Sequence, residues 1–400
     1  MHVLVVHNRY RERGGEDAVV EHEVGLLRSA GHEVTEYGRH NDEIDESAPW
    51  EAALQALWSR RTTRDIEVIV QRRRPDVVHV HNAFPLVSPS VFWAAARAGI
   101  PVVQTLHNFR LICPQGLLLR EGRPCESCIG TLPLPAIRHA CYRGSRSQSA
   151  VVAGMTVLHQ GLGTWKRKVD RYIALSEFSR GRLVAGGLPA ERVVVKPNSV
   201  HAPPPIPEVP RTGLLFAGRL STEKGLDTLV HAAASLPART VRVAGSGPMA
   251  GLLAAEPAII PLGRLDRDAL GREMAGAIAL VLPSACYENS PLAVLEAFAS
   301  GLPVIASRIG ALAEIVEDGV TGLLFEPGSP DALREKMSWA LAHPEAMRAM
   351  GQAARQRHAR SYAPQENLRR LIEIYESVLT GTRCREPRLA AQAAPGEMLP

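Results

Sequence analysis

The sequence has little of what defines several large classes of protein. Only 5% of its 400 residues are aromatic, which argues against a stacking platform for single-stranded nucleic acid. Its longest apolar runs, 150–158 and 275–282, fall well short of the ~20 residues that span a bilayer. No charged leader precedes the strand-like residues at the start, so we expect a cytoplasmic protein.

Cysteine is scarce too, with six residues in the whole chain. Without a secretory signal, these six indicate reduced thiols or metal ligands, not disulfides. The net charge of +5 is small for this length, but residues 138–182 alone carry an excess of seven positive charges. Such an excess fits an anionic partner, such as phosphorylated lipid at the inner face of the plasma membrane, or simply a solvated basic face. We expect no nucleic-acid partner.

Short β-branched runs alternate with helical segments along most of the chain, and they are nearly continuous hydrophobic stretches. This pattern is typical of parallel strands covered on both faces, so it predicts an α/β fold. The expected strands are 3–7, 33–37, 77–81, 102–106, 172–176, 193–196, 214–218, 240–245, 259–262, 279–283, 304–307 and 322–325.

Five prolines within residues 203–210 separate two halves of similar length. Proline fixes φ and removes an amide donor, so we expect a stiff linker over 201–211. The predicted domains are therefore 1–200 and 212–360. A helix over 361–379 is expected to pack back on the first domain, and 380–400 is expected to form a disordered tail.

The segment 283–303 carries the strongest chemical signal. A loop with Glu288 follows an expected strand, and Ser290 and Pro291 suit the N-cap and first position of a helix. That helix is apolar all round except for Glu296, and a buried carboxylate needs partners. Ligand hydroxyls would supply them, while the free helix amides would hold a phosphate. An internal salt bridge for Glu296 is the alternative.

A second signal lies at the first strand of the same half. Arg219 follows the strand 214–218, and Lys224 stands where the next helix is expected to begin. A cation at a helix N-terminus opposes the helix dipole, at a cost of roughly 0.3–1 kcal/mol. Two cations at this place therefore indicate an anion between them, such as a diphosphate, rather than surface charge.

The Glu-x7-Glu spacing of Glu288 and Glu296 and the Arg-x4-Lys spacing of Arg219 and Lys224 occur together with Gly-Ser-Gly-Pro at 245–248. This combination resembles the retaining glycosyltransferases of family 4. The resemblance covers the chain from its start to about residue 379. It implies the GT-B fold, in which two Rossmann-like domains face each other across a cleft.

The resemblance also implies roles. Arg219 and Lys224 would neutralise the diphosphate of a nucleoside diphosphate sugar, Glu288 would contact the sugar hydroxyls, and Glu296 would bind the ribose. The other donor contacts that it implies in this half are Asn289, Ser290, Pro291, Leu292, Gly245, Gly263, Arg264 and Leu265. No cofactor would be required for catalysis.

The first half is expected to present the acceptor. Gly14 and Gly15 follow the first strand, where a Gly-Gly turn lets backbone approach the donor closely, although plain turns are commoner. By the resemblance, His107 would be a catalytic residue that reaches the sugar or the acceptor. His79 and His81 are expected to be structural or acceptor-side residues, not metal ligands.

Two further patterns concern metals. Asp266 and Asp268 match the Asp-x-Asp of metal-dependent glycosyltransferases, but they suit an N-cap and a first helical turn better, so we expect no catalytic metal. Cys113, Cys125, Cys128 and Cys141 fit either a structural zinc site, at which His139 could compete, or unliganded thiols.

The expected reaction moves a sugar from a nucleoside diphosphate sugar to a glycan or lipid-linked acceptor with retention, in cell-surface polysaccharide or glycolipid biosynthesis. The alternatives are a GT-B epimerase or hydrolase of sugar nucleotides, and a non-enzymatic, zinc-containing binding protein.

Overall fold

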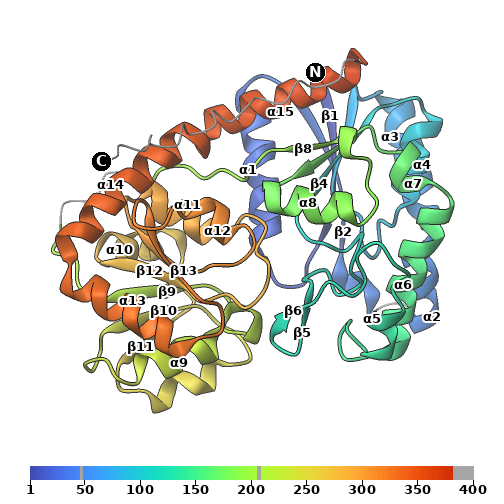
Figure 1. Cartoon of the computed structure of the whole chain (residues 1–400). Helices are drawn as coiled ribbons and strands as arrows, with labels where there is room; N and C mark the ends of the chain where they lie inside the picture. Colours follow the sequence, from blue (N-terminus) through green and yellow to red (C-terminus); the bar gives the residue numbers. More distant parts are fainter. Residues whose placement is uncertain (46–47, 205–208, 382–400) are drawn as a thin grey trace, which may run out of the picture.

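The computed structural model describes residues 1–45, 48–204 and 209–381, which form two α/β lobes (Figure 1). Parts of the predicted linker and tail, 205–208 and 382–400, lie outside the described residues. Among the described residues, no helix has the length and apolar character needed to cross a bilayer.

The N-terminal lobe is built on a six-stranded parallel sheet in the order β2-β1-β3-β4-β7-β8. These strands are β1 (His2–Arg9), β2 (Glu33–His40), β3 (Val77–Asn82), β4 (Val102–Leu106), β7 (Arg171–Ala174) and β8 (Val193–Val195). Its helices are α1 (Gly15–Ser29), η1 (Asn41–Ile44), α2 (Pro49–Leu57), α3 (Arg60–Arg72), α4 (Ser90–Arg97), α5 (Leu134–Arg138), α6 (Arg146–Gly161), α7 (Thr164–Arg167), α8 (Glu177–Ala185) and η2 (Ala190–Arg192). A short antiparallel hairpin, β5 (Leu119–Arg120) and β6 (Arg123–Pro124), stands apart from the sheet.

The C-terminal lobe has a second six-stranded parallel sheet, in the order β11-β10-β9-β12-β13-β14. These strands are β9 (Leu214–Ala217), β10 (Val241–Ala244), β11 (Ile259–Gly263), β12 (Ala279–Leu282), β13 (Val304–Ser307) and β14 (Gly322–Phe325). Its helices are η3 (Thr222–Lys224), α9 (Leu226–Ala233), η4 (Ala250–Ala255), α10 (Arg267–Ala275), α11 (Leu292–Ala299), α12 (Leu312–Ile315), α13 (Pro330–Ala342) and α14 (Pro344–Ser361).

The α/β prediction is confirmed, and each of the twelve predicted strands overlaps an observed one. The central strands β3, β4, β9, β12 and β13 are buried along their whole length. Helices on both faces of each sheet cause this burial, which is why the strand sequences are continuous apolar runs.

The last helix, α15 (Pro364–Leu379), leaves the C-terminal lobe and runs along the N-terminal one (Figure 1). Its residues Leu371, Ile374 and Tyr375 are buried in a cluster with Val5 of β1 and Val24 of α1. The core of the N-terminal lobe is therefore completed by the end of the described chain.

Candidate active site

Neighbouring strands are not consecutive in the chain at two places in the N-terminal sheet, β1/β3 and β4/β7, and at one place in the C-terminal sheet. In the C-terminal lobe this place lies between β9 and β12. The loops after these two strands leave the same edge in opposite directions, and ligands of open α/β sheets bind in the crevice between such loops. Arg219 and Lys224 follow β9, while Glu288 follows β12.

Gly225 is what lets the two loops touch. Its φ of 69° is left-handed, and a Cβ there would lie 1.8 Å from the carbonyl oxygen of Pro283. No other residue type could approach Pro283 so closely. The turn that ends in Lys224 therefore rests directly on the loop that carries Glu288.

Lys224 and Glu288 form an ion pair. Lys224 Nζ donates to Glu288 Oε1 at 2.6 Å, and Ser284 Oγ donates to the same oxygen at 2.8 Å. Burial opposes the charged form of Lys224, but the nearby Glu288 carboxylate outweighs it, so the pKa of Lys224 is raised. Lys224 and Glu288, which were expected to contact the diphosphate and the sugar of a donor, contact each other here.

Arg219 differs from Lys224 because its side chain is exposed. Within the described part of the chain it has no hydrogen-bond or ion-pair partner. The loop thus presents one cation already paired with a carboxylate and one that remains available to an anion.

The start of α11 corrects the predicted cap. The helix begins at Leu292, its N-cap is Pro291, and no side chain caps it. Ser290 Oγ instead accepts from the backbone N–H of Asn198, and Asn198 Nδ2 donates to the Ser290 carbonyl oxygen at 3.0 Å. The prediction of Ser290 as N-cap was wrong because this residue is engaged by the other lobe.

Two further contacts bring the lobes together at the same loop. Asn289 Nδ2 donates to the backbone carbonyl oxygen of His107 at 2.7 Å. A Cβ on Gly15 would lie 3.7 Å from Leu292 Cδ1, so the Gly14-Gly15 turn faces the start of α11. The structure therefore brings His107, Gly15 and the Glu288 loop to one place.

The glycine-rich turn after β10 lies beside Gly218. Gly245 has a φ of 149°, and a Cβ on it would lie 1.9 Å from the Gly218 carbonyl oxygen. The Gly245 N–H donates to the Gly263 carbonyl oxygen at 2.8 Å. Gly245 thus has a packing reason for being there, whereas Gly263 has a left-handed φ of 68° with open space around it. The neighbouring Arg264 is exposed.

Glu296 and Leu265 line a cavity of about 690 Å³ between the lobes, together with Leu292 and Arg267. Its opposite wall is formed by α1 and the chain near residue 200. Burial raises the pKa of Glu296, and Arg267 acts in the opposite direction. The internal salt bridge considered for Glu296 is absent from the described residues, so its carboxylate remains available in the cavity.

Asp266 is the N-cap of α10, where its side chain accepts from the Ala269 N–H at 2.7 Å, and Asp268 lies in the first turn. The predicted capping role of this pair is confirmed. The carboxylate of Asp266 is therefore engaged in holding the start of a helix.

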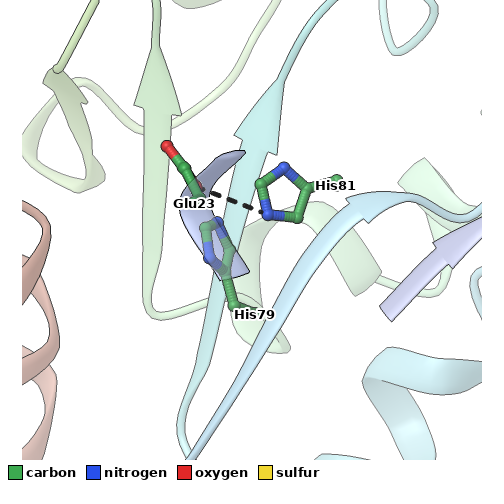
Figure 2. A group of neighbouring side chains, drawn as sticks. All are labelled: Glu23, His79 and His81. Carbon is green, nitrogen blue, oxygen red and sulfur yellow. Dashed lines mark ion pairs between the residues drawn. The ribbon is translucent and has the colours of Figure 1, made fainter. Parts of the chain in front are cut away.

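Nothing in the sequence indicated the buried polar network that lies behind His107. Lys196 Nζ donates to Glu23 Oε1 and, at 3.0 Å, to Asn367 Oδ1. Figure 2 shows Glu23 of α1 directed toward His79 and His81 of β3, with Glu23 Oε2 3.5 Å from His81 Nε2. The other His81 ring nitrogen, Nδ1, lies 3.0 Å from His107 Nε2.

Glu23, His79 and His81 are close enough to share a metal ion. However, both ring nitrogens of His79 already have partners, Tyr375 Oη at 2.7 Å and Thr105 Oγ1 at 2.8 Å. Burial opposes the Glu23 carboxylate, but the Lys196 ammonium outweighs it and lowers its pKa. Glu23 Oε1 and both nitrogens of His79 are therefore satisfied by protein neighbours, whereas Glu23 Oε2 and His81 Nε2 face each other without a hydrogen bond. The group lies directly behind His107.

Glu16, in the first turn of α1, was also missed. Tyr10 Oη donates to Glu16 Oε2 at 2.9 Å, while Glu16 Oε1 is buried and has no hydrogen bond. Burial raises the pKa of this carboxyl from 4.5 to about 8. The Gly-Gly signal pointed to this turn, but nothing in the sequence indicated that its acid is buried.

The fold and this site define a GT-B glycosyltransferase. Residues 205–357 match the family described as glycosyl transferases group 1, and residues 14–199 match a glycosyl transferase 4-like domain. A glycogen synthase of Mycobacterium tuberculosis is 30% identical over 335 residues, 79% of this chain and 72% of that protein. The chain belongs to the group 1 glycosyltransferases and is a glycosyltransferase enzyme.

Other relatives are more distant or longer. A sulfoquinovosyl transferase of Arabidopsis thaliana is 27% identical over 72% of this chain, which spans only 54% of that protein. Sucrose-phosphate synthase from Thermosynechococcus elongatus shares the fold with a TM-score of 0.72 and 18% identity, over 95% of this chain and all of that one. HepE from Anabaena, solved in complex with UDP-glucose, gives 0.65 and 16%, over 94% of this chain and all of that one.

Proposed function

We propose that the protein transfers a sugar from a nucleoside diphosphate sugar to a hydroxyl group of a glycan or lipid-linked acceptor, with retention of configuration. The observation that carries this proposal is the Lys224–Glu288 pair, which lies where the loops after β9 and β12 meet and where Asn289 contacts His107. The structural neighbour solved with UDP-glucose supports the class of donor.

The donor would extend along this crevice. Arg219, Lys224 and the free amides at the start of α11 offer positive potential to a diphosphate, whose departure they would assist by stabilising its developing charge. Glu296 would accept hydrogen bonds from the ribose hydroxyls in the cavity beside it. Glu288, held by Lys224 and Ser284, would be positioned against the sugar.

Retention would follow from attack on the same face of the sugar, without a covalent enzyme intermediate. A glycosyl-enzyme would need a carboxylate free to act as nucleophile. Glu288 Oε1 instead accepts from Lys224 and Ser284, which makes it a poor nucleophile. The leaving diphosphate would accept the proton of the acceptor hydroxyl.

A thermal-shift screen with UDP-, GDP- and ADP-sugars tests the donor class. One nucleotide series should raise the melting temperature of the protein, and Lys224→Ala should abolish that increase. With the donor so identified, the anomeric configuration of the product reports retention. A donor consumed equally well without any acceptor would support the epimerase or hydrolase alternative instead.

A second proposal concerns the place of action, and we infer a contact with an anionic membrane surface. The apolar stretch of the basic segment forms α6 and α7, and its residues Val152, Met155 and Trp165 are buried in the lobe's core. That side of the segment therefore faces the core. Leu158 and Leu162 nevertheless remain exposed, and α2 lies beside α6.

On α2, Trp50 and Leu54 are 63% and 56% exposed, an unusual position for large apolar side chains. Lys166 and Arg167 follow α6 and are exposed, whereas Lys168 lies over the Trp93 ring at 4.5 Å. Apolar side chains beside cations suit the surface of an anionic leaflet. At that surface the enzyme would bind a lipid-linked acceptor.

Flotation with liposomes that contain anionic lipid tests this contact. Binding should weaken at high salt, and it should fall in Trp50→Ala/Leu54→Ala and in Lys166→Gln/Arg167→Gln. Trp339→Ala, which removes an exposed tryptophan of the other lobe, is the control and should float like wild type. Absence of flotation at low salt would refute the proposal.

A further inference from the structure

The long segment between β4 and α6 contains little regular structure. Residues 107–145 include only the two-residue strands β5 and β6 and the five-residue helix α5. Irregular segments of this length in compact domains normally need a function or an additional link. Four of the six non-glycine residues with left-handed φ in the described chain lie here: Leu118, Glu121, Ala140 and Arg143. Each such conformation costs of order 1 kcal/mol or more, so something must hold the segment in place.

Four cysteines from separate parts of this segment meet around one small cavity. Cys113 follows β4, Cys125 and Cys128 follow the hairpin, and Cys141 lies between α5 and α6. All four line a cavity of about 10 Å³, about the size of a single water molecule or ion. None of them forms a disulfide. His139 is exposed and is not among the residues that line this cavity.

We propose that these four thiols bind one zinc ion as a tetrathiolate site. Four cysteine ligands with a C-x2-C pair are the usual composition of a closed structural zinc site. The site carries two net negative charges when loaded, and Arg120, which lines the same cavity, compensates part of that charge. In the structure Cys125 Sγ donates to Ser127 Oγ at 3.4 Å, so zinc binding would require this thiol to leave Ser127 and turn toward the other three.

The site also has a connection to the donor loop, and this part rests on the proposed function. Glu126 lies between Cys125 and Cys128, and it accepts from Arg182 Nη1 at 2.8 Å and from Tyr287 Oη at 3.0 Å. Tyr287 belongs to the other lobe and directly precedes Glu288. Its ring lies 4.6 Å from that of Phe178. The zinc site thus fixes Glu126, which in turn positions the Glu288 loop against the N-terminal lobe.

Metal analysis of the full-length protein, purified under reducing conditions without chelator, tests the site directly. We expect one equivalent of zinc per chain, and its loss in Cys125→Ser and Cys128→Ser. Cys286→Ser removes a buried cysteine of the other lobe and should keep the zinc. Cobalt added to the apo-protein should give the absorption of tetrahedral cobalt thiolate, a readout that does not require the variants to fold.

Metal-free wild-type protein whose thiols all react with a thiol reagent, or a disulfide found among the four by mass spectrometry, would overturn the zinc assignment. Glu126→Gln tests the connection separately. This variant should retain zinc and the melting temperature of wild type but raise the donor KM several-fold. Tyr287→Phe should raise the donor KM in the same way, and the double variant should show no further increase. Zinc retained with an unchanged donor KM would refute the positioning role alone, whatever the outcome for the transfer reaction.

Discussion

Asn289 of the C-terminal lobe donates its side-chain amide to the backbone carbonyl oxygen of His107 in the N-terminal lobe, at 2.7 Å. The bond joins the loop that carries Glu288 to the end of β4. The ring of His107 contacts a buried polar network, which reaches α15 through His81, Glu23 and Lys196. This bond is therefore one of several polar contacts that fix the two lobes at the site, together with those of Ser290 with Asn198 and of Tyr287 with Glu126.

Substitutions that remove or reverse the donor at Asn289 test this contact. Asn289→Ala removes the donor and should lower the transfer rate about tenfold, equivalent to roughly 1.4 kcal/mol, within the range of one buried hydrogen bond. Asn289→Asp keeps the shape but sets a carboxylate against the His107 carbonyl, so it should be worse than Ala. Initial rates at saturating donor decide this. An aspartate variant as active as wild type would contradict a role for the bond.

The capping role of Asp266 predicts a loss of stability without a loss of chemistry. Asp266→Ala should lower the free energy of unfolding by about 1 kcal/mol because the start of α10 loses its cap. Asp266→Asn, which can still cap, should be close to wild type, and both should transfer at normal rates during brief exposure to EDTA. If both variants were inactive and Mn²⁺ restored activity to EDTA-treated wild type, the pair would be a metal site.

Glu16 predicts a pH dependence of stability. Burial raises its folded-state pKa to about 8, whereas the unfolded carboxyl titrates near 4.5. Between these pH values Glu16 is protonated in the folded state but ionised in the unfolded state. The stability that Glu16 contributes is therefore fully present below pH 4.5 and is lost as pH rises through 8. The slope is at most about 1.4 kcal/mol per pH unit. Glu16→Gln should therefore gain stability relative to wild type at pH 8 compared with pH 5.

Urea unfolding at the two pH values measures that difference. Glu12→Gln neutralises an exposed acid in the loop before α1 and is the control, which should follow wild type at both pH values. An equal effect of Glu16→Gln at pH 5 and pH 8 would show that this carboxyl is not buried as described.

The sequence was sufficient for the sheets because parallel strands that are buried on both faces must be continuous apolar runs. It also placed Lys224 and Glu288 at one sheet edge, since both follow such strands. It did not predict their ion pair, which depends on the close approach of Gly225 to Pro283. Ser290 was misread because its cap-like context is local, whereas its partner Asn198 comes from the other lobe.

The support behind His107 could not be found in the same way. Lys196 and Glu23 are 173 positions apart, and each looks like an ordinary surface charge in its own segment. Only the packing of α1 and α15 against the chain that follows β8 brings them together in the interior. The residues of such a buried polar network follow no characteristic spacing in the sequence. The network can therefore be recognised only once the folded structure is known.

The central claim is that Lys224 binds the diphosphate of the donor and does not merely neutralise Glu288. The most direct measurement is the affinity of the free nucleoside diphosphate identified by the donor screen, determined by calorimetry for Lys224→Ala and Glu288→Gln. The remote Lys336→Ala on α13 is the control. We predict that Lys224→Ala weakens this binding at least about tenfold. It should also lower the transfer rate on the order of 100-fold, a typical loss for one group that stabilises developing charge. Glu288→Gln and Lys336→Ala should bind the diphosphate like wild type. Unchanged diphosphate affinity in Lys224→Ala would contradict the account and leave Lys224 only as the partner of Glu288.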